Sequence, residues 1–210
     1  MTYLSSYRMG NNSECLRSQG QNSRAGIILN ALDVFGDTRA RNWDREARDL
    51  ERLGYSSEEV DLRQYFRDNE GLRHRLEALD LVWVVGGSAF ALARAMVSSG
   101  FATALEPGMQ RRLIYAGYSA GACVAGPDLR GINFMDDPDD IPAGYDPAVP
   151  PLTLGLVPFR IVPHWKSDHP DAANAQRTVE YLERSSLPYK ALRDGEALVI
   201  DEHKPGEVRS

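Results

Sequence analysis

The sequence predicts an α/β fold, a three-layer α/β/α sandwich built around a mostly parallel sheet. Short apolar runs alternate with amphipathic stretches along the chain, which is the pattern of successive βαβ units. Two of the apolar runs end in glycine-containing turns that lead directly into a helix-like stretch. The chain of 210 residues shows no internal repeat and no composition break, so we expect a single domain over residues 1–210.

Each element follows from its local pattern. Helical spacing is clearest at residues 42–53, where Trp43, Ala47 and Leu50 line one face and Gly54 ends the helix. The other predicted elements are strands at 26–32, 59–62, 81–85 and 113–116, helices at 71–79, 89–97 and 173–184, and a closing hairpin of strands 189–192 and 197–200 around the turn 194–195. Residues 127–158 are rich in Pro, Gly and Asp and predict a long functional loop.

Composition argues against several classes of function. The net charge of −6 leaves no basic excess to neutralise phosphates, which argues against a nucleic-acid partner. Cys15 and Cys123 supply neither a disulfide framework nor a metal site. The first residues lack the apolar core of a signal peptide, and no apolar run approaches the roughly 20 residues of a membrane helix. We therefore expect a cytoplasmic monomer or homodimer with no cofactor, metal or membrane partner.

The pentapeptide Gly117-Tyr118-Ser119-Ala120-Gly121 lies between a predicted strand and a predicted helix. A serine in this context is typical of a nucleophile elbow, because the tight turn needs small flanking residues and lifts the hydroxyl above the sheet edge. The amide groups that follow point to the same place and can hold an oxyanion. The same residues also suit a glycine-rich turn that only packs tightly. A serine is unreactive without a base, so the catalytic interpretation of Ser119 requires one.

His164 is the candidate base. It ends the apolar run 159–163, which places it at a sheet edge, where the catalytic groups of open α/β folds gather. Asp136 and Asp137 lie between Ser119 and His164 in the chain and can supply the orienting acid. A residue before proline favours an extended conformation, in which neighbouring side chains point to opposite sides. Asp137 precedes a proline and should point outward, so we expect Asp136 to be the acid and keep Asp137 as the alternative.

A second glycine pair, Gly86-Gly87, follows the most apolar predicted strand and precedes Ser88. Its amides can provide an oxyanion donor opposite Ala120. A phosphate-binding loop is the rival interpretation, but the further glycine of a dinucleotide fingerprint and the Lys-Ser/Thr of a P-loop are missing.

These segments, in this order, resemble the peptidase E (aspartyl dipeptidase) family. The resemblance covers most of the chain and is densest at residues 82–90, 116–122 and 154–164. Members of the family have a fold similar to class I glutamine amidotransferases, with a serine in place of the amidotransferase cysteine. A serine–histidine–acid triad hydrolyses peptides in that family.

The resemblance implies that Ser119 is the nucleophile, His164 the base, and the amides near Gly87 and Ala120 the oxyanion hole. The family's aspartate falls at Phe134, so the acid role passes to Asp136 or Asp137 or is absent. The resemblance also points to substrate contacts at four positions, two of which depart from the family pattern. Ser88 stands where the family commonly has asparagine, and Asn174 stands where an arginine is expected, with the other two positions being Gly86 and Arg177.

The leading hypothesis is therefore serine-dependent hydrolysis of short peptides, of dipeptidase or exopeptidase type, with Asp-X specificity in doubt because those acid-binding partners are changed. An esterase of the α/β-hydrolase type shares the elbow, but the short separation of Ser119 and His164 leaves little room for that fold's extra strands and lid. A non-catalytic amidotransferase-like module that binds a small ligand is the alternative from another class.

Overall fold

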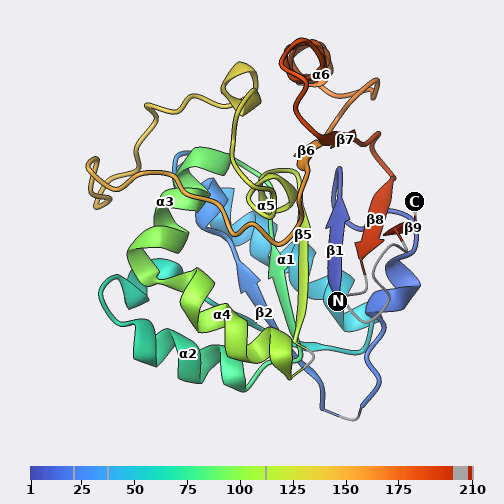
Figure 1. Ribbon diagram of the computed structural model, residues 1–210. Helices are drawn as coiled ribbons and strands as arrows, with labels where there is room; N and C mark the ends of the chain where they lie inside the picture. The colour runs from blue at the N-terminus through green and yellow to red at the C-terminus, as the bar shows by residue number, and fades with distance from the viewer. Residues whose placement is uncertain (21, 37, 112, 201–207, 210) are drawn as a thin grey trace.

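A mostly parallel sheet forms the centre of the molecule. The computed structural model describes residues 1–20, 22–36, 38–111, 113–200 and 208–209. Within them a seven-stranded sheet runs in the order β3-β2-β4-β5-β1-β8-β9 (Figure 1). The first five strands in this order are mutually parallel, whereas β8 pairs antiparallel with β1 and β9 pairs antiparallel with β8 at one edge. The strands are β1 (Thr2–Ser5), β2 (Arg24–Ile28), β3 (Ser56–Glu59), β4 (Leu81–Val84), β5 (Ile114–Tyr118), β8 (Ala197–Ile200) and β9 (Val208–Arg209).

Helices cover both faces of this sheet. Strand β4 is fully buried, and its alternate side chains enter two different cores: Val82 and Val84 pack on one face, Leu81 and Trp83 on the other. The face of Trp83 is covered by α1 (Thr38–Arg52). The face of Val84 is covered by α2 (Asn69–Glu77), α3 (Ala89–Ser99), α4 (Phe101–Gln110) and α5 (Ala120–Cys123). The predicted three-layer α/β/α sandwich is confirmed.

A second, two-stranded sheet lies beyond the carboxyl ends of the parallel strands (Figure 1). It pairs β6 (Arg160–Val162) with β7 (Tyr189–Ala191) in parallel, and α6 (Ala172–Arg184) packs on it through a small apolar cluster. The hairpin that the sequence predicts between β7 and β8 is therefore wrong, although both strands exist. Strand β8 is almost entirely buried and pairs with β1, because its apolar residues have cores to fill on both faces of the large sheet.

Other elements also differ from the sequence prediction: the strand predicted at 26–32 ends at Ile28, and Asn30–Leu32 form a 3-10 helix. The edge strand is β3, just before the predicted 59–62, and it is polar because it lies at the sheet edge. Strand β1 was not predicted, yet it is buried between β5 and β8. Helix α4 follows α3 directly across Gly100, whose left-handed φ of 68° ends one helix and starts the next.

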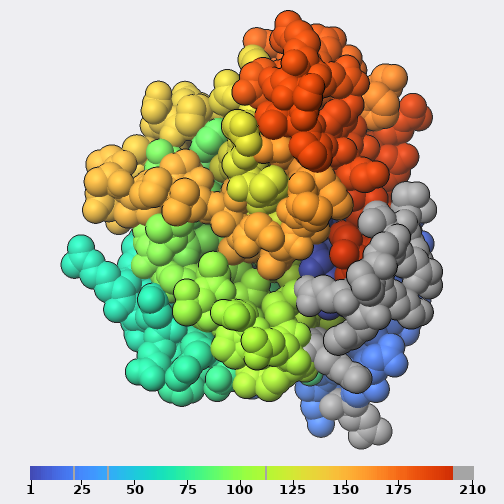
Figure 2. Space-filling view, in the orientation of Figure 1, coloured from blue at the N-terminus to red at the C-terminus, as the bar shows by residue number. Residues whose placement is uncertain are grey.

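The predicted long loop, residues 127–158, is irregular apart from the short 3-10 helix η4 (Ile132–Phe134). Together with α6 it covers the end of the molecule at which the parallel strands finish (Figure 2). Among the described residues, no helix combines the length and apolarity that crossing a membrane requires.

Candidate active site

Ser119 lies in a strained turn between the end of β5 and the start of α5. Its φ of 49° and ψ of −114° lie outside the regions that side-chain-bearing residues ordinarily occupy. Glycines make this turn possible. A Cβ on Gly117 would lie 2.6 Å from the carbonyl oxygen of Gly121, and a Cβ on Gly121 would lie 2.2 Å from that of Val84. The sharp turn therefore depends on backbone packing against the neighbouring strand.

His164 meets Ser119 from the second sheet. It follows β6, and its Nε2 lies 3.0 Å from Ser119 Oγ. Its Nδ1 lies 2.8 Å from Oδ1 of Asp194, in the turn between β7 and β8. If Nδ1–H donates to this carboxylate, Nε2 is left to accept the proton of the serine hydroxyl.

Ser6, just after β1, braces this arrangement. Its Oγ accepts a hydrogen bond from the backbone N–H of His164 at 2.7 Å and donates one to Asp194 Oδ1 at 2.7 Å. The backbone N–H of Asp194 in turn donates to Ser167 Oγ at 2.7 Å. The histidine and its carboxylate are thus held both to each other and to the large sheet.

The surroundings favour a neutral His164. The side chain is 3% exposed, and burial lowers its pKa below the ordinary value of 6.5. The hydrogen bond and charge of Asp194 oppose this shift without cancelling it, while the neighbouring His169 adds to it. A neutral imidazole at neutral pH is the form that can accept a proton.

The carboxylate that meets His164 is neither of the two that the sequence suggested. Asp136 Oδ2 accepts the backbone N–H of Ala89 at 2.8 Å, at the start of α3, and Asp137 Oδ1 accepts that of Asp139 at 2.9 Å. The expectation that Asp136 or Asp137 orients the histidine is wrong. The argument from extended backbone fails because this segment is turned: the N–H of Asp136 donates to the carbonyl of Ile132 at 2.9 Å.

Asp136 nevertheless lines the same cleft as Ser119. Burial raises its pKa to about 6, and the charge of Asp171 adds to the shift. Sequence reasoning assigned Asp194 to a hairpin turn and missed it. The signal that could have found it is an acidic residue shortly after a strand, at the sheet edge where His164 was already expected.

Some of the remaining predicted site residues line the cleft, and the others do not. Gly86, Gly87 and Ala120 line the cleft beside Ser119, and a Cβ on Gly87 would lie 2.3 Å from the carbonyl oxygen of Ala31. Their service as oxyanion donors stays a prediction. Ser88 is 3% exposed, and its side chain accepts the N–H of Ala91 as the cap of α3, so its hydroxyl is already used inside the fold.

Asn174 and Arg177, on α6, lie outside the residues that line the cleft. Arg177 donates to Asn174 Oδ1 at 3.2 Å, and its guanidinium lies 4.8 Å from the centre of the Phe134 ring. These two side chains are hydrogen-bonded to each other at the surface of the helix. The expectation that they contact substrate is not supported by their positions.

A cleft of about 400 Å³ surrounds the serine and the histidine, which is the size of a small-ligand site. Tyr7 and Phe35 stand at it with 41% and 50% of their surface exposed, an unusual position for aromatic side chains. Tyr7 also approaches His169, whose ring stacks on that of His164 with the centroids 3.7 Å apart. The histidine is thus packed on one face as well as hydrogen-bonded at both nitrogens.

A buried polar network lies on the other side of the serine and was not predicted. Glu46 of α1 is fully buried and accepts hydrogen bonds from Trp83 Nε1 at 2.8 Å and from the hydroxyl of Tyr118 at 3.0 Å. Arg45 donates to the same carboxylate and also lines the cleft. The helical pattern of residues 42–53 located the apolar face of α1 but gave no sign that these two charged residues turn inward.

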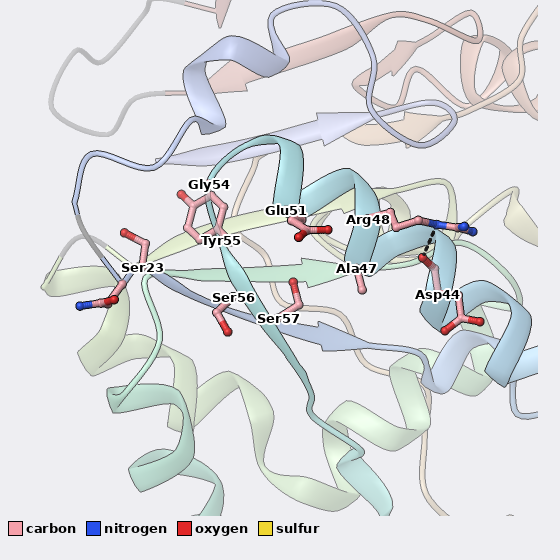
Figure 3. A pocket seen from close by; sticks show the side chains of 10 residues that line it. Ser23, Asp44, Ala47, Arg48, Glu51, Gly54, Tyr55, Ser56 and Ser57 are labelled. Carbon is pink, nitrogen blue, oxygen red and sulfur yellow. Dashed lines mark hydrogen bonds between the residues drawn. The ribbon is translucent and has the colours of Figure 1, made fainter.

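A larger and more open hollow of about 750 Å³ lies elsewhere, between α1 and the edge strand β3 (Figure 3). Its walls are mainly polar and include Asp44, Arg48, Glu51 and Ser57. None of the residues that line it belongs to the Ser119 cleft. The serine and histidine therefore mark the smaller cleft as the candidate active site.

The fold and this site define an α/β protein with a serine–histidine–carboxylate arrangement at the carboxyl edge of a parallel sheet. Residues 37–207 match the model of peptidase family S51. The chain is 36% identical to peptidase E of Streptomyces coelicolor over 132 residues, which is 60% of this chain and 51% of that protein. It is 31% identical to peptidase E of Actinobacillus pleuropneumoniae serotype 5b over 140 residues, 63% of this chain and 56% of the relative.

A solved structure from Listeria monocytogenes EGD-e, of a protein named as a candidate peptidase E, has a similar fold. Its TM-score is 0.76 at 20% identity, with 99% of this chain and 96% of that chain covered. The chain described here belongs to peptidase family S51, the peptidase E family. The matched segments span only 51% and 56% of the two curated relatives, so their names do not by themselves assign an activity to this chain.

Proposed function

We propose that this protein is a serine peptidase that hydrolyses short peptides of dipeptidase or exopeptidase type, with Ser119 as nucleophile, His164 as base and Asp194 as the orienting acid. The observation that carries the proposal is the chain of contacts from Ser119 Oγ to His164 Nε2 at 3.0 Å and from Nδ1 to Asp194 at 2.8 Å. The family of the chain and the strained turn at Ser119 support the same reading.

In the first half-reaction, Ser119 Oγ bonds to the scissile carbonyl carbon while His164 Nε2 takes the hydroxyl proton. The carbonyl electron pair moves to its oxygen, and we expect the N–H groups of Gly87 and Ala120, which line the cleft, to donate hydrogen bonds to it. His164 then gives the proton to the leaving nitrogen as the C–N bond breaks, and an acyl-enzyme remains. Asp194 stabilises the imidazolium in between.

In the second half-reaction, water attacks the acyl carbon while His164 again takes a proton. The bond between the acyl carbon and Ser119 Oγ breaks, and the proton returns to the serine. Because His164 must be neutral to begin each half, the burial that lowers its pKa favours activity at neutral pH.

The proposal is tested with a fluorophosphonate probe and a panel of dipeptides. The wild-type protein should be labelled at Ser119, and Ser119→Ala and His164→Ala should each lose at least about 10⁴-fold in peptide hydrolysis. The double variant should be little worse than either single one, because triad members act as a unit. A wild-type protein that is neither labelled nor able to hydrolyse peptides would indicate the non-catalytic binding module instead.

A further inference from the structure

We propose that Arg45 forms a subsite for a substrate carboxylate at the end of the cleft opposite Asp136. This inference rests on the proposed peptidase function and adds a specificity-determining residue, Arg45, that recognises a carboxylate of a short peptide substrate. The argument starts from how Arg45 is held.

Three neighbours fix the guanidinium of Arg45. Its Nε and Nη2 donate to Glu46 Oε1 at 2.9 and 2.6 Å. Its Nη2 also donates to Asn42 Oδ1 at 2.6 Å and to the hydroxyl of Tyr118 at 3.0 Å. Together these contacts engage Nε and Nη2, and because the guanidinium is planar and rigid they also fix the position of Nη1.

The remaining nitrogen of the guanidinium, Nη1, can still bind a ligand. Within the described residues, Nη1 makes no hydrogen bond, and the side chain is 31% exposed while it lines the cleft. Glu46, by contrast, is fully buried, and its two oxygens already accept from Trp83, Tyr118 and Arg45. Glu46 therefore positions the arginine and is itself shielded from an incoming anion. A carboxylate is the group that the N–H donors of arginine recognise best.

The position of Arg45 relative to Ser119 suits a short peptide. Its partner Tyr118 directly precedes the nucleophile, and α1 brings Arg45 to the sheet edge from the face that carries Trp83. Asp136 reaches the cleft from the opposite face, beside Met135, which packs against the other core. The cleft therefore has the Glu46-paired guanidinium of Arg45 on one side and a negative side at Asp136, with the serine at the strand end between them.

The negative side is suited to the amino group of the peptide. One carboxylate oxygen of Asp136 accepts the N–H of Ala89, and Asp171 also lines the cleft. An ammonium group would relieve the repulsion between these two carboxylates. A peptide bound with its ammonium at Asp136 and a carboxylate at Arg45 would extend across Ser119.

The carboxylate can come from the C-terminus of the peptide or from an acidic side chain, and three dipeptides separate these sources. Asp-Leu carries both carboxylates, Asn-Leu lacks the side-chain one, and Asp-Leu amide lacks the terminal one. Removal of the carboxylate that Arg45 binds should lower kcat/KM of the wild-type protein by about ten- to a hundredfold, as expected for a charged hydrogen bond. Removal of the other carboxylate should have a smaller effect.

The test compares Arg45→Gln with the matched control Arg48→Gln. Arg48 lies on the same helix, donates to the carbonyl of Asp44 at 2.9 Å and borders the other hollow (Figure 3). In Arg45→Gln the preference for the recognised carboxylate should vanish, whereas Arg48→Gln should keep it in full. Arg45→Lys should recover only part of it, because an ammonium group lacks the planar fork by which the neighbours fix the orientation of the arginine. Equal losses on all three dipeptides in Arg45→Gln would show a structural role only and overturn the proposal.

Binding of the same dipeptides to Ser119→Ala, measured by calorimetry with and without Arg45→Gln, separates this inference from the proposed chemistry. If the wild-type protein is not labelled by the fluorophosphonate but Ser119→Ala still binds with the carboxylate preference, the peptidase proposal fails and the subsite stands. If labelling occurs but no dipeptide is bound or cleaved with a preference that depends on Arg45, the subsite is refuted and the peptidase proposal stands.

Discussion

The two halves of the candidate active site are built in different ways. The half that carries Ser119 is local: one strand, one turn and one helix, with Gly117 and Gly121 packed against neighbouring backbone. The half that carries His164 and Asp194 is assembled from residues far apart in the chain, which meet because β6 pairs with β7 and β8 pairs with β1. A local turn produces a recognisable sequence motif, whereas contacts between residues far apart in the chain produce almost no sequence signal.

The largest expected effect comes from substitution of Asp194, the acid that the second half supplies. Asp194→Asn should lower kcat by about 10³- to 10⁴-fold, because an amide can hold the wrong tautomer of His164. Asp136→Asn should cost much less, since its carboxylate contacts the start of α3 and not the histidine. Steady-state kinetics on a cleaved dipeptide measure both effects.

Asp137→Asn serves as the control, because Asp137 only closes an exposed turn with Asp139. It should leave turnover nearly unchanged. A larger loss in Asp136→Asn than in Asp194→Asn would mean that the working acid is the one suggested by the order of residues in the chain, and that the contact seen here is not the functional one.

The local half can be tested through stability. Gly121→Ala should destabilise the fold by about 3 kcal/mol or more, because the new Cβ would lie 2.2 Å from the carbonyl oxygen of Val84 and backbone cannot give way as a flexible side chain can. Gly20→Ala is the matched control, since among the described residues its Cβ would meet only Ser23 Oγ, at an ordinary 3.5 Å. Urea unfolding of both variants measures the difference. Equal stability of the two would show that the turn at Ser119 does not depend on this glycine.

The sequence was sufficient for the parts of the fold whose burial is local. Strand β4 is continuously apolar and buried on both faces, so its sequence predicts a central parallel strand. Strand β1 could not be recognised in the same way, because Thr2–Ser5 is short and includes polar residues, although the strand is buried between β5 and β8. Its importance is considerable, since Ser6 follows it and braces both His164 and Asp194.

The candidate site shows the same limit. Ser119 and His164 could be identified because each directly follows a strand that the sequence indicates. Asp194 could not, because its role depends on which strands its neighbours join, and a buried β8 prefers the large sheet to a hairpin. Glu46 escaped recognition for a related reason: a charged residue is buried only when its partners are supplied from elsewhere, here by Trp83 and Tyr118.

The smallest expected effect concerns the pH dependence of activity, through His164 and Asp136. His164 must be neutral to act as base, and burial lowers its pKa below 6.5, so protonation of His164 reduces activity only as the pH falls below that value. Asp136 must be ionised to hold an ammonium group, and its pKa is raised from 3.8 to about 6, so it loses its charge as the pH falls through that range. Both protonations act in the same direction.

In the wild-type protein, log kcat/KM should therefore fall with a limiting slope approaching two as the pH is lowered, whereas Asp136→Asn should show a slope of one. At a pH one unit below the pKa of Asp136, the second proton should account for about a tenfold extra loss. Acid unfolding through Asp136 does not explain such a loss. Its raised pKa means that the folded chain binds this proton more readily than the unfolded chain, so its protonation stabilises the fold as the pH falls. Measurement of kcat/KM across the acid range at constant ionic strength decides the matter: identical slopes in the two proteins would remove Asp136 from substrate binding and leave His164 as the group that sets the acid limb.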